Sequence, residues 1–146
     1  MSGNRSGGGR RFVVGYDGSG HATAALRWAL AHADAEGAAV AAIEVVAPET
    51  AFVPAAPMSP QPHGGQPPRR PLPEPAELLG DHARVPLSVE RVEGRTGRAL
   101  AEAARDADLV VIGAHHSPAH ITSGVGAFAA DCLRHAGCPV VIVPAE

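Results

Sequence analysis

The stretch GAHHSPAHITSGVGAF, residues 113–128, carries glycines at two places where a backbone can approach a phosphate closely. Gly113 ends an apolar run, and Gly126 precedes a segment with helical character. Backbone N–H groups at such a loop and at a helix start can bind an anion. His116 and Ala127 stand where a loop of this kind normally offers another glycine and a hydroxyl group. The chemistry indicated is phosphate binding with part of its usual donor set missing.

Two further turns are expected to reach the same site. YDGSG (16–20) and EVVAP (44–48) each end an apolar run. In a parallel sheet such turns meet at the carboxyl edge, where helix N-termini present free N–H groups. Asp17 could accept a hydrogen bond from a base or a ribose, or hold a metal. The local sequence favours the alternative that Asp17 is a turn residue bonding its own backbone.

Several other chemistries do not fit the sequence. His115, His116 and His120 are spaced unlike any common metal site, so we predict solvated loop residues and no metal. Neither Ser19 nor Ser123 lies in a G-x-S-x-G nucleophile turn. All 12 basic residues are arginine. The absence of lysine excludes a P-loop lysine and a Schiff base.

Composition indicates one domain of 146 residues, with a core of small aliphatic side chains because only 3% of residues are aromatic. The net charge of -3 argues against nucleic-acid binding, and no apolar run reaches the roughly 18 residues of a membrane span. We predict a flexible tail over residues 1–10 and a cytoplasmic protein, because the N-terminus lacks the apolar region of a signal peptide. The two cysteines, Cys132 and Cys138, are too few for a zinc ribbon and are predicted to be buried thiols.

The elements that must position these residues alternate between strand and helix. Strands are predicted at 12–14, 38–47, 84–94, 107–114 and 138–145. Ser19 is expected to cap a helix that Gly37 ends, and Thr96 to cap the next. A third helix is expected to open at Ser123 or the nearby glycines and to end at Gly137. Predicted inward positions are Ala22, Ala25, Leu26, Ala29, Leu30 and Ala33 in the first helix, Ala99, Leu100, Ala103 and Ala104 in the second, and Phe128, Cys132, Leu133 and Ala136 in the third. This pattern predicts an α/β fold with a parallel sheet and right-handed crossovers.

One segment does not fit the alternation. Residues 48–75 contain ten prolines, which deny the backbone a regular helix. Only PAELLGDHAR, residues 75–84, could form a turn or two. We therefore predict that a proline-rich loop replaces most of the helix between the second and third strands.

Three stretches in this order resemble the universal stress protein family: VVGYDGSGHATAALRWAL, VERVEGRTGRALAEAARDADLVVIGA and GAFAADCLRHAGCPVVIVP. The resemblance covers residues 11–146. It implies a doubly wound, Rossmann-like sheet of five parallel strands in the order 3-2-1-4-5, of the adenine nucleotide alpha hydrolase-like type. It further implies a cytoplasmic homodimer without an established catalytic reaction.

Nucleotide-binding members of that family carry a glycine, two residues, a second glycine, nine residues, then a glycine followed by serine or threonine. Here Gly113 and Gly126 match, whereas His116 replaces the middle glycine. Ala127 and Ala129 replace hydroxyl residues. The remaining candidate residues of the nucleotide site are Asp17, which matches the acid after the first strand, Val45, which falls beside the adenine, and their neighbours Tyr16 and Phe128. The resemblance therefore implies weak or absent binding of ATP with a divalent cation, with Ser123, Thr122 or His116 as substitute donors.

Three functions remain open. The first is a non-catalytic stress-response or signalling module with a degenerate nucleotide site. The second is an ATP-binding or slowly ATP-hydrolysing protein using Asp17 with a metal. The third is a partner-docking protein whose proline-rich loop, with PPRRP near Pro67, enters a polyproline-reading groove. Strand order by resemblance also places Pro139 to Val143 at a sheet edge, where we expect a homodimer.

Overall fold

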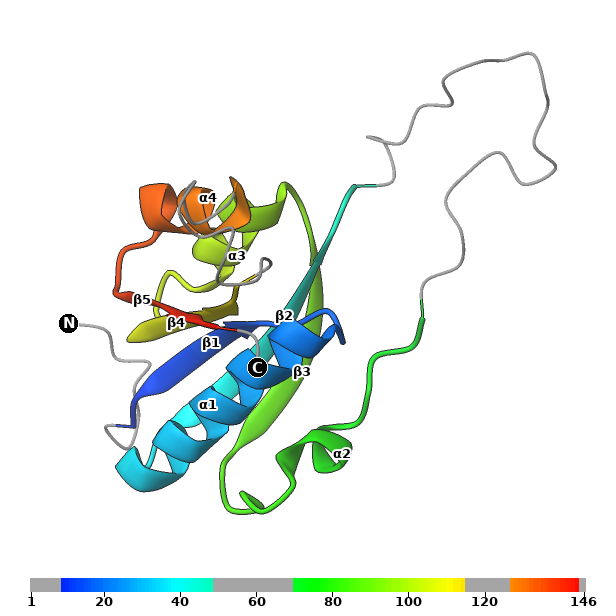
Figure 1. Cartoon of the computed structure of the whole chain (residues 1–146), viewed down its shortest axis with the longest axis vertical. Coiled ribbons are helices and arrows are strands. Elements are labelled where there is room, and N and C mark those ends of the chain that lie inside the picture. Colours follow the sequence, from blue (N-terminus) through cyan, green and yellow to red (C-terminus); the bar gives the residue numbers. More distant parts are fainter. Residues whose placement is uncertain (1–8, 49–69, 115–126, 145–146) are drawn as a thin grey trace, which may run out of the picture.

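The computed structural model describes residues 9–48, 70–114 and 127–144, which form one layered α/β unit (Figure 1). The predicted N-terminal tail and the central part of the proline-rich loop lie largely outside these ranges. In chain order the elements are β1 (Arg11–Gly15), α1 (Gly20–Glu36), β2 (Ala39–Val46), α2 (Pro75–Leu79), β3 (Leu87–Glu93), α3 (Thr96–Ala103), β4 (Leu109–Gly113), α4 (Ala127–His135) and β5 (Val140–Val143).

The five strands form one parallel sheet in the order β3-β2-β1-β4-β5, which confirms the predicted fold and strand order. Val13 of β1 lies opposite Ala41 on one side and Val110 on the other. The order reverses between β1 and β4, so the connections leave these neighbouring strands in opposite directions. A sheet of this type opens a crevice at the carboxyl ends of those two strands.

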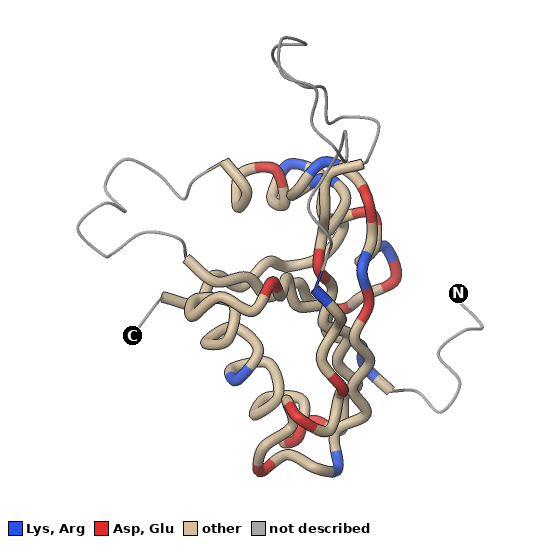
Figure 2. The backbone as a smooth tube through the Cα atoms, turned by 90° about the vertical axis from the view of Figure 1, so that its right-hand side faces the viewer, with Lys and Arg blue, Asp and Glu red and all other residues tan. Residues whose placement is uncertain are grey.

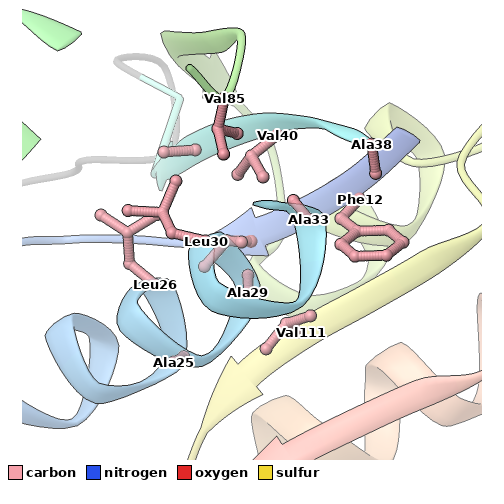
Figure 3. Close-up of a cluster of buried hydrophobic side chains, with 12 residues drawn as sticks. Phe12, Ala25, Leu26, Ala29, Leu30, Ala33, Ala38, Val40, Val85 and Val111 are labelled. Carbon is pink, nitrogen blue, oxygen red and sulfur yellow. The ribbon is translucent and has the colours of Figure 1, made fainter. Parts of the chain in front are cut away.

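Helix α1 covers one face of the sheet and packs on it through small and aliphatic side chains (Figure 3). Its ends are as predicted. The Ser19 side chain accepts the N–H of Ala22, and Gly37 ends the helix in the left-handed conformation at φ 72°. The six predicted inward residues are all buried. Because four of them are alanines, the helix axis can approach the strands closely.

Helices α3 and α4 cover the opposite face, over Val13, Ile43, Val110 and Ile112. The two helices touch each other at Gly97. A Cβ at this position would come within 2.6 Å of the Phe128 carbonyl oxygen, so only glycine allows this approach. The thiol of Cys132 donates to the Gly97 carbonyl oxygen at 3.7 Å, and burial raises its pKa to about 11. Cys132 is buried as predicted, whereas Cys138 is only partly buried.

Three predictions about the helices are wrong. Thr96 does not cap α3, because Arg95 occupies the cap position and no side chain bonds there. Helix α4 ends at His135, before Gly137. Leu133 is 52% exposed rather than inward, since α4 contacts the sheet near its β5 edge and only Ala129 and Cys132 of this helix are buried. The predicted helix start at Ser123 lies outside the described residues.

The described part of the crossover from β2 to β3 contains one short helix, α2, where the sequence predicts a turn or two. The capping box of Glu74 and Glu77 begins it, and Leu78 and Leu79 pack against the α1 side of the sheet. Residues 70–74, which precede α2, form neither helix nor strand. The face of the sheet beside them therefore has no long helix over it among the described residues.

Acidic and basic residues lie interspersed along the described backbone (Figure 2). Three pairs among the described residues join segments far apart in the sequence: Arg91 of β3 with Glu44 of β2, His82 after α2 with Asp34 of α1, and Arg10 before β1 with Glu36 of α1. None of the described helices has both the length and the apolar character needed to cross a membrane.

Candidate functional site

A cavity of about 170 Å³ lies at the carboxyl edge of the sheet, where the turn after β1 meets the ends of β2 and β4. The structure brings five of the predicted site residues together around it: Tyr16, Asp17, Val45, Gly113 and Phe128. They come from three strands or strand ends and from the first turn of α4. The convergence of these residues makes this cavity the candidate site.

Other predicted site residues lie elsewhere. Ala127 is exposed at the first position of α4. Ala129 is 5% exposed and belongs to the hydrophobic cluster beneath that helix rather than to the cavity wall. His116 and Gly126 lie outside the described residues, as do the proposed substitute donors Thr122 and Ser123. Among the described residues, no group of three His, Cys, Asp or Glu side chains could hold a metal ion.

Asp17, Ser19 and His21 form a hydrogen-bonded chain at the rim of the cavity. One carboxylate oxygen of Asp17, Oδ1, accepts both the Ser19 N–H at 3.0 Å and the Ser19 hydroxyl at 2.5 Å. The Ser19 hydroxyl oxygen lies 3.0 Å from Nε2 of His21 and 3.3 Å from the Ala22 N–H. A hydroxyl has one donor and two acceptor sites. Since its proton goes to Asp17, Ser19 accepts from both His21 and Ala22.

This chain sets the charge of Asp17. Partial burial acts to raise the pKa of Asp17, but the hydrogen bonds from Ser19 and the charge of His21 outweigh it, so the pKa lies below its ordinary value. Asp17 is therefore a carboxylate at neutral pH, and it lies in the wall of the cavity. The interpretation of Asp17 as a turn residue bonding its own backbone is confirmed, because its side chain accepts the backbone N–H two residues on.

Gly113 has a packing role that the sequence did not reveal. A Cβ at this position would overlap the carbonyl oxygen of His21 in the first turn of α1. Glycine therefore lets α1 start directly against the end of β4. This packing contact is a sufficient reason for glycine at position 113 even without a ligand. The missing side chain also leaves the Gly113 backbone exposed to the cavity.

Phe128 forms the α4 side of the cavity. The end of its ring, Cζ, lies 3.6 Å from the position that a Cβ on Gly15 would occupy. Its backbone is fixed by the contact between α4 and Gly97, since the Phe128 carbonyl oxygen lies against that glycine. The width of the cavity thus depends on how closely α3 and α4 pack.

Sequence reasoning missed six lining residues: Gly15, His21, Ala22, Ile43, Thr96 and Ile112. Strand periodicity could have found Ile43, because it shares a face with Val45. His21 and Thr96 lie in first turns of helices, where side chains face the carboxyl edge of the sheet. Treating Thr96 only as a helix cap concealed its place in the cavity wall.

Comparisons with known proteins agree with this fold. The chain resembles, at 22% identity and a TM-score of 0.62, the universal stress protein UspA from Lactobacillus plantarum, with 92% of this chain and 97% of that chain covered. It resembles a universal stress protein in complex with cAMP at 23% identity and a TM-score of 0.62, covering 94% and 98% of the two chains. A universal stress protein from Archaeoglobus fulgidus in complex with dAMP gives 16% identity and a TM-score of 0.53, covering 92% and 96%.

No curated protein sequence matches the chain. A sequence model of the Usp family, described as the universal stress protein family, matches residues 9–144. That range includes every described element and every residue around the cavity. The chain belongs to the universal stress protein family.

Proposed function

We propose that the chain is a non-catalytic stress-response or signalling module whose cavity holds the adenine ring of a nucleotide with low affinity. The observation that carries the proposal is the convergence of Tyr16, Asp17, Val45, Gly113 and Phe128 on one cavity at the edge of the sheet. Two universal stress proteins of similar fold have been solved with cAMP and with dAMP, which both contain adenine.

The cavity suits a flat base better than a whole nucleotide. Ligand sites for larger molecules enclose about 300–1,000 Å³, whereas this one encloses about 170 Å³. Ile43 and Val45 of β2 and Phe128 of α4 provide apolar surface around the cavity. Asp17 Oδ2 provides an acceptor for an amino group at the rim, because Ser19 occupies only Oδ1. Purine rings combine such apolar faces with polar edges.

Low affinity follows from the start of α4. Ala127, exposed at the first position of this helix, offers no hydroxyl donor to a phosphate, whereas Ala129 is buried beneath the helix. A hydrogen bond to a charged group contributes about 1.5–3 kcal/mol. The loss of one such bond corresponds to a roughly tenfold or greater loss of affinity. A dissociation constant of about 0.1 mM for ATP is therefore expected.

The hydrogen bonds at the rim support a binding role over hydrolysis. In a serine-nucleophile site the histidine accepts the hydroxyl proton, and the acid orients the histidine. Here the Ser19 hydroxyl donates its hydrogen bond to Asp17, so His21 Nε2 must be the donor in its contact with the same hydroxyl. Neither Ser19 nor Asp17 Oδ1 is available to activate water. In the alternative function, slow ATP hydrolysis, the other carboxylate oxygen of Asp17, Oδ2, would have to activate the water by itself.

Titration of the full chain with ATP, AMP and cAMP by calorimetry tests the proposal. Val45→Ala should weaken binding about tenfold, because two methyl groups that would contact the base are lost. Val46→Ala, on the opposite side of the same strand, is the matched control and should bind as the parent does. A low-micromolar ATP affinity, or phosphate release above that of Asp17→Asn, would contradict the proposal. Equal effects of the two valine variants would place the base elsewhere.

A further inference from the structure

A second cavity lies on the other side of the turn that follows β1. It encloses about 430 Å³, within the range of about 300–1,000 Å³ found for small-molecule sites. Its floor is the carboxyl half of β2 and β3, on the sheet face that carries α1 and α2, and includes Val89 and Arg91. The turn at residues 16–18 forms one wall and the extended segment 70–73 forms the other.

Among the described residues of the crossover, the short helix does not cover this cavity. Helix α2 has only five residues and lies near the start of β3, so it does not reach the carboxyl half of that strand (Figure 1). Arg91 holds the extended segment there instead. Its guanidinium pairs with Glu44 at 2.9 Å and donates to the carbonyl oxygen of Arg70. The positive charge of Arg91 is thereby balanced, and its donors are used to fix the wall of the cavity.

Arg70 brings a second guanidinium to the cavity. Its Nη2 atom lies 3.9 Å from the position that a Cβ on Gly18 would take, beside the turn after β1. Within the described ranges, no carboxylate forms an ion pair with this side chain, in contrast to Arg91. A guanidinium fork matches the two oxygens of a carboxylate or a phosphate. The donors of Arg70 are thus placed to receive an anion.

The other cavity walls restrict the kind of anion. The lining contains three carboxylates, Asp17, Glu44 and Glu77, beside the two arginines, and this negative balance disfavours a doubly charged group more strongly than a singly charged one. Glu44 is balanced by Arg91, and Glu77 accepts the backbone N–H of Glu74. The remaining surface is apolar and comes from Tyr16, Leu72, Val89 and two prolines, Pro71 and Pro73. A singly charged anion with a flat apolar body matches both features.

We propose that this cavity binds a small carboxylic acid with an aromatic or similarly flat body. Arg70 holds the carboxylate at the side of Gly18, and the body lies among Tyr16, Leu72 and Val89. The site is separate from the proposed adenine cavity, which lies on the opposite face of the sheet, and it binds the acid whether or not a nucleotide is present.

Binding of benzoate to the full chain, followed by saturation-transfer NMR and calorimetry, tests this site. For so small a ligand we expect a dissociation constant of about 1 mM. Benzamide, which has the same shape without the charge, and benzylphosphonate, which approaches two charges, should both bind about tenfold more weakly. Arg70→Gln should abolish benzoate binding. Arg84→Gln removes an exposed arginine from the turn before β3 and is the matched control.

Several results would overturn the proposal. They are no benzoate binding at ~10 mM, equal affinity for benzoate and benzamide, or an unchanged affinity in Arg70→Gln. Val45→Ala should leave benzoate binding intact, since Val45 lines only the first cavity. Loss of benzoate binding in that variant would assign the ligand to the adenine cavity instead.

Discussion

Ser19 connects the start of α1 to the candidate site at the scale of a single residue. Its hydroxyl caps the helix by accepting the Ala22 N–H, and it also donates to Asp17 and contacts His21. One side chain therefore stabilises the helix and fixes the direction of the carboxylate at the cavity rim. Thr96, by contrast, begins α3 without a capping bond.

Ser19→Ala should lower stability by about 1 kcal/mol, equivalent to a fall in Tm of roughly 2–4 °C. The pKa of Asp17 should rise, because a hydrogen-bond donor to its charged form is removed. Thermal denaturation and an NMR titration of the Asp17 carboxyl measure the two effects. Thr96→Ala is the control and should leave Tm nearly unchanged. An equal loss in both variants would show that the Ser19 cap contributes nothing specific.

Ala127 and Ala129 lie on different sides of α4, so restored hydroxyls should behave differently. Ala127→Ser places its hydroxyl at the exposed helix start, where ATP affinity should rise about tenfold from one added bond to phosphate. Ala129→Ser places it among the apolar side chains of the cluster beneath α4, so it should lower stability by about 1–3 kcal/mol without raising affinity. Calorimetry with ATP and urea denaturation separate the outcomes. A gain from Ala129→Ser alone would mean that α4 shifts when a nucleotide binds.

At the scale of elements, the contact between α3 and α4 determines the width of the adenine cavity. A side chain at Gly97 would meet the Phe128 carbonyl oxygen and the main chain at Cys132, 3.0 Å away at its nitrogen. The two helices would have to separate, and Phe128 would move with α4. Because the Phe128 oxygen and the Cys132 nitrogen are both main-chain atoms, a change of side-chain rotamer cannot relieve the strain.

Gly97→Ala should therefore cost about 1–3 kcal/mol of stability and weaken any nucleotide binding as well. Gly20→Ala is the matched control. That glycine begins α1 with nothing within 4 Å of an added Cβ, so the variant should be as stable as the parent or slightly more so. Urea denaturation of both variants tests this. A Gly97→Ala protein with unchanged stability would show that the helices can separate freely.

The strands and α1 could be predicted because their apolar patterns are long and their boundaries carry clear signals such as Ser19 and Gly37. Strand order came from family resemblance rather than from periodicity. The exposure of Leu133 could not be predicted, since it depends on how far α4 overlaps the sheet edge. Tyr16, Asp17, Val45, Gly113 and Phe128 lie around one cavity, while their role in nucleotide binding stays a prediction. The second cavity could not be predicted, because it depends on the path that residues 70–73 take beside β3.

At the scale of the whole molecule, β5 is an edge strand of the sheet. The Val110 N–H bonds the Pro139 carbonyl, and the Ala114 N–H bonds the Val143 carbonyl. In a parallel ladder alternate residues bond the same neighbour. Val140 and Ile142 therefore turn their backbone N–H groups away from β4. An uncharged edge of this kind favours pairing with a second copy, so we propose a homodimer through Pro139 to Val143.

Ile142→Pro should give a folded monomer, because it removes an outward N–H while the bonds to β4 remain. Ile142→Val keeps that N–H and should remain dimeric, which makes it the control for the loss of side-chain volume. Light scattering after gel filtration gives the mass, and circular dichroism checks the fold. A wild-type chain that is monomeric at micromolar concentration would refute the proposed dimer.

The turn after β1 forms part of both cavities, since Tyr16 and Asp17 line each of them. Ser19 bonds one oxygen of the Asp17 carboxylate, Oδ1, and the negative charge of this carboxylate lies beside both cavities. An amino group that binds Asp17 in the first cavity reduces the repulsion between Asp17 and a carboxylic acid in the second. If both cavities take their proposed ligands, their occupancies are thermodynamically linked through this carboxylate. The factor by which a carboxylic acid alters nucleotide affinity must then equal the factor by which the nucleotide alters acid affinity.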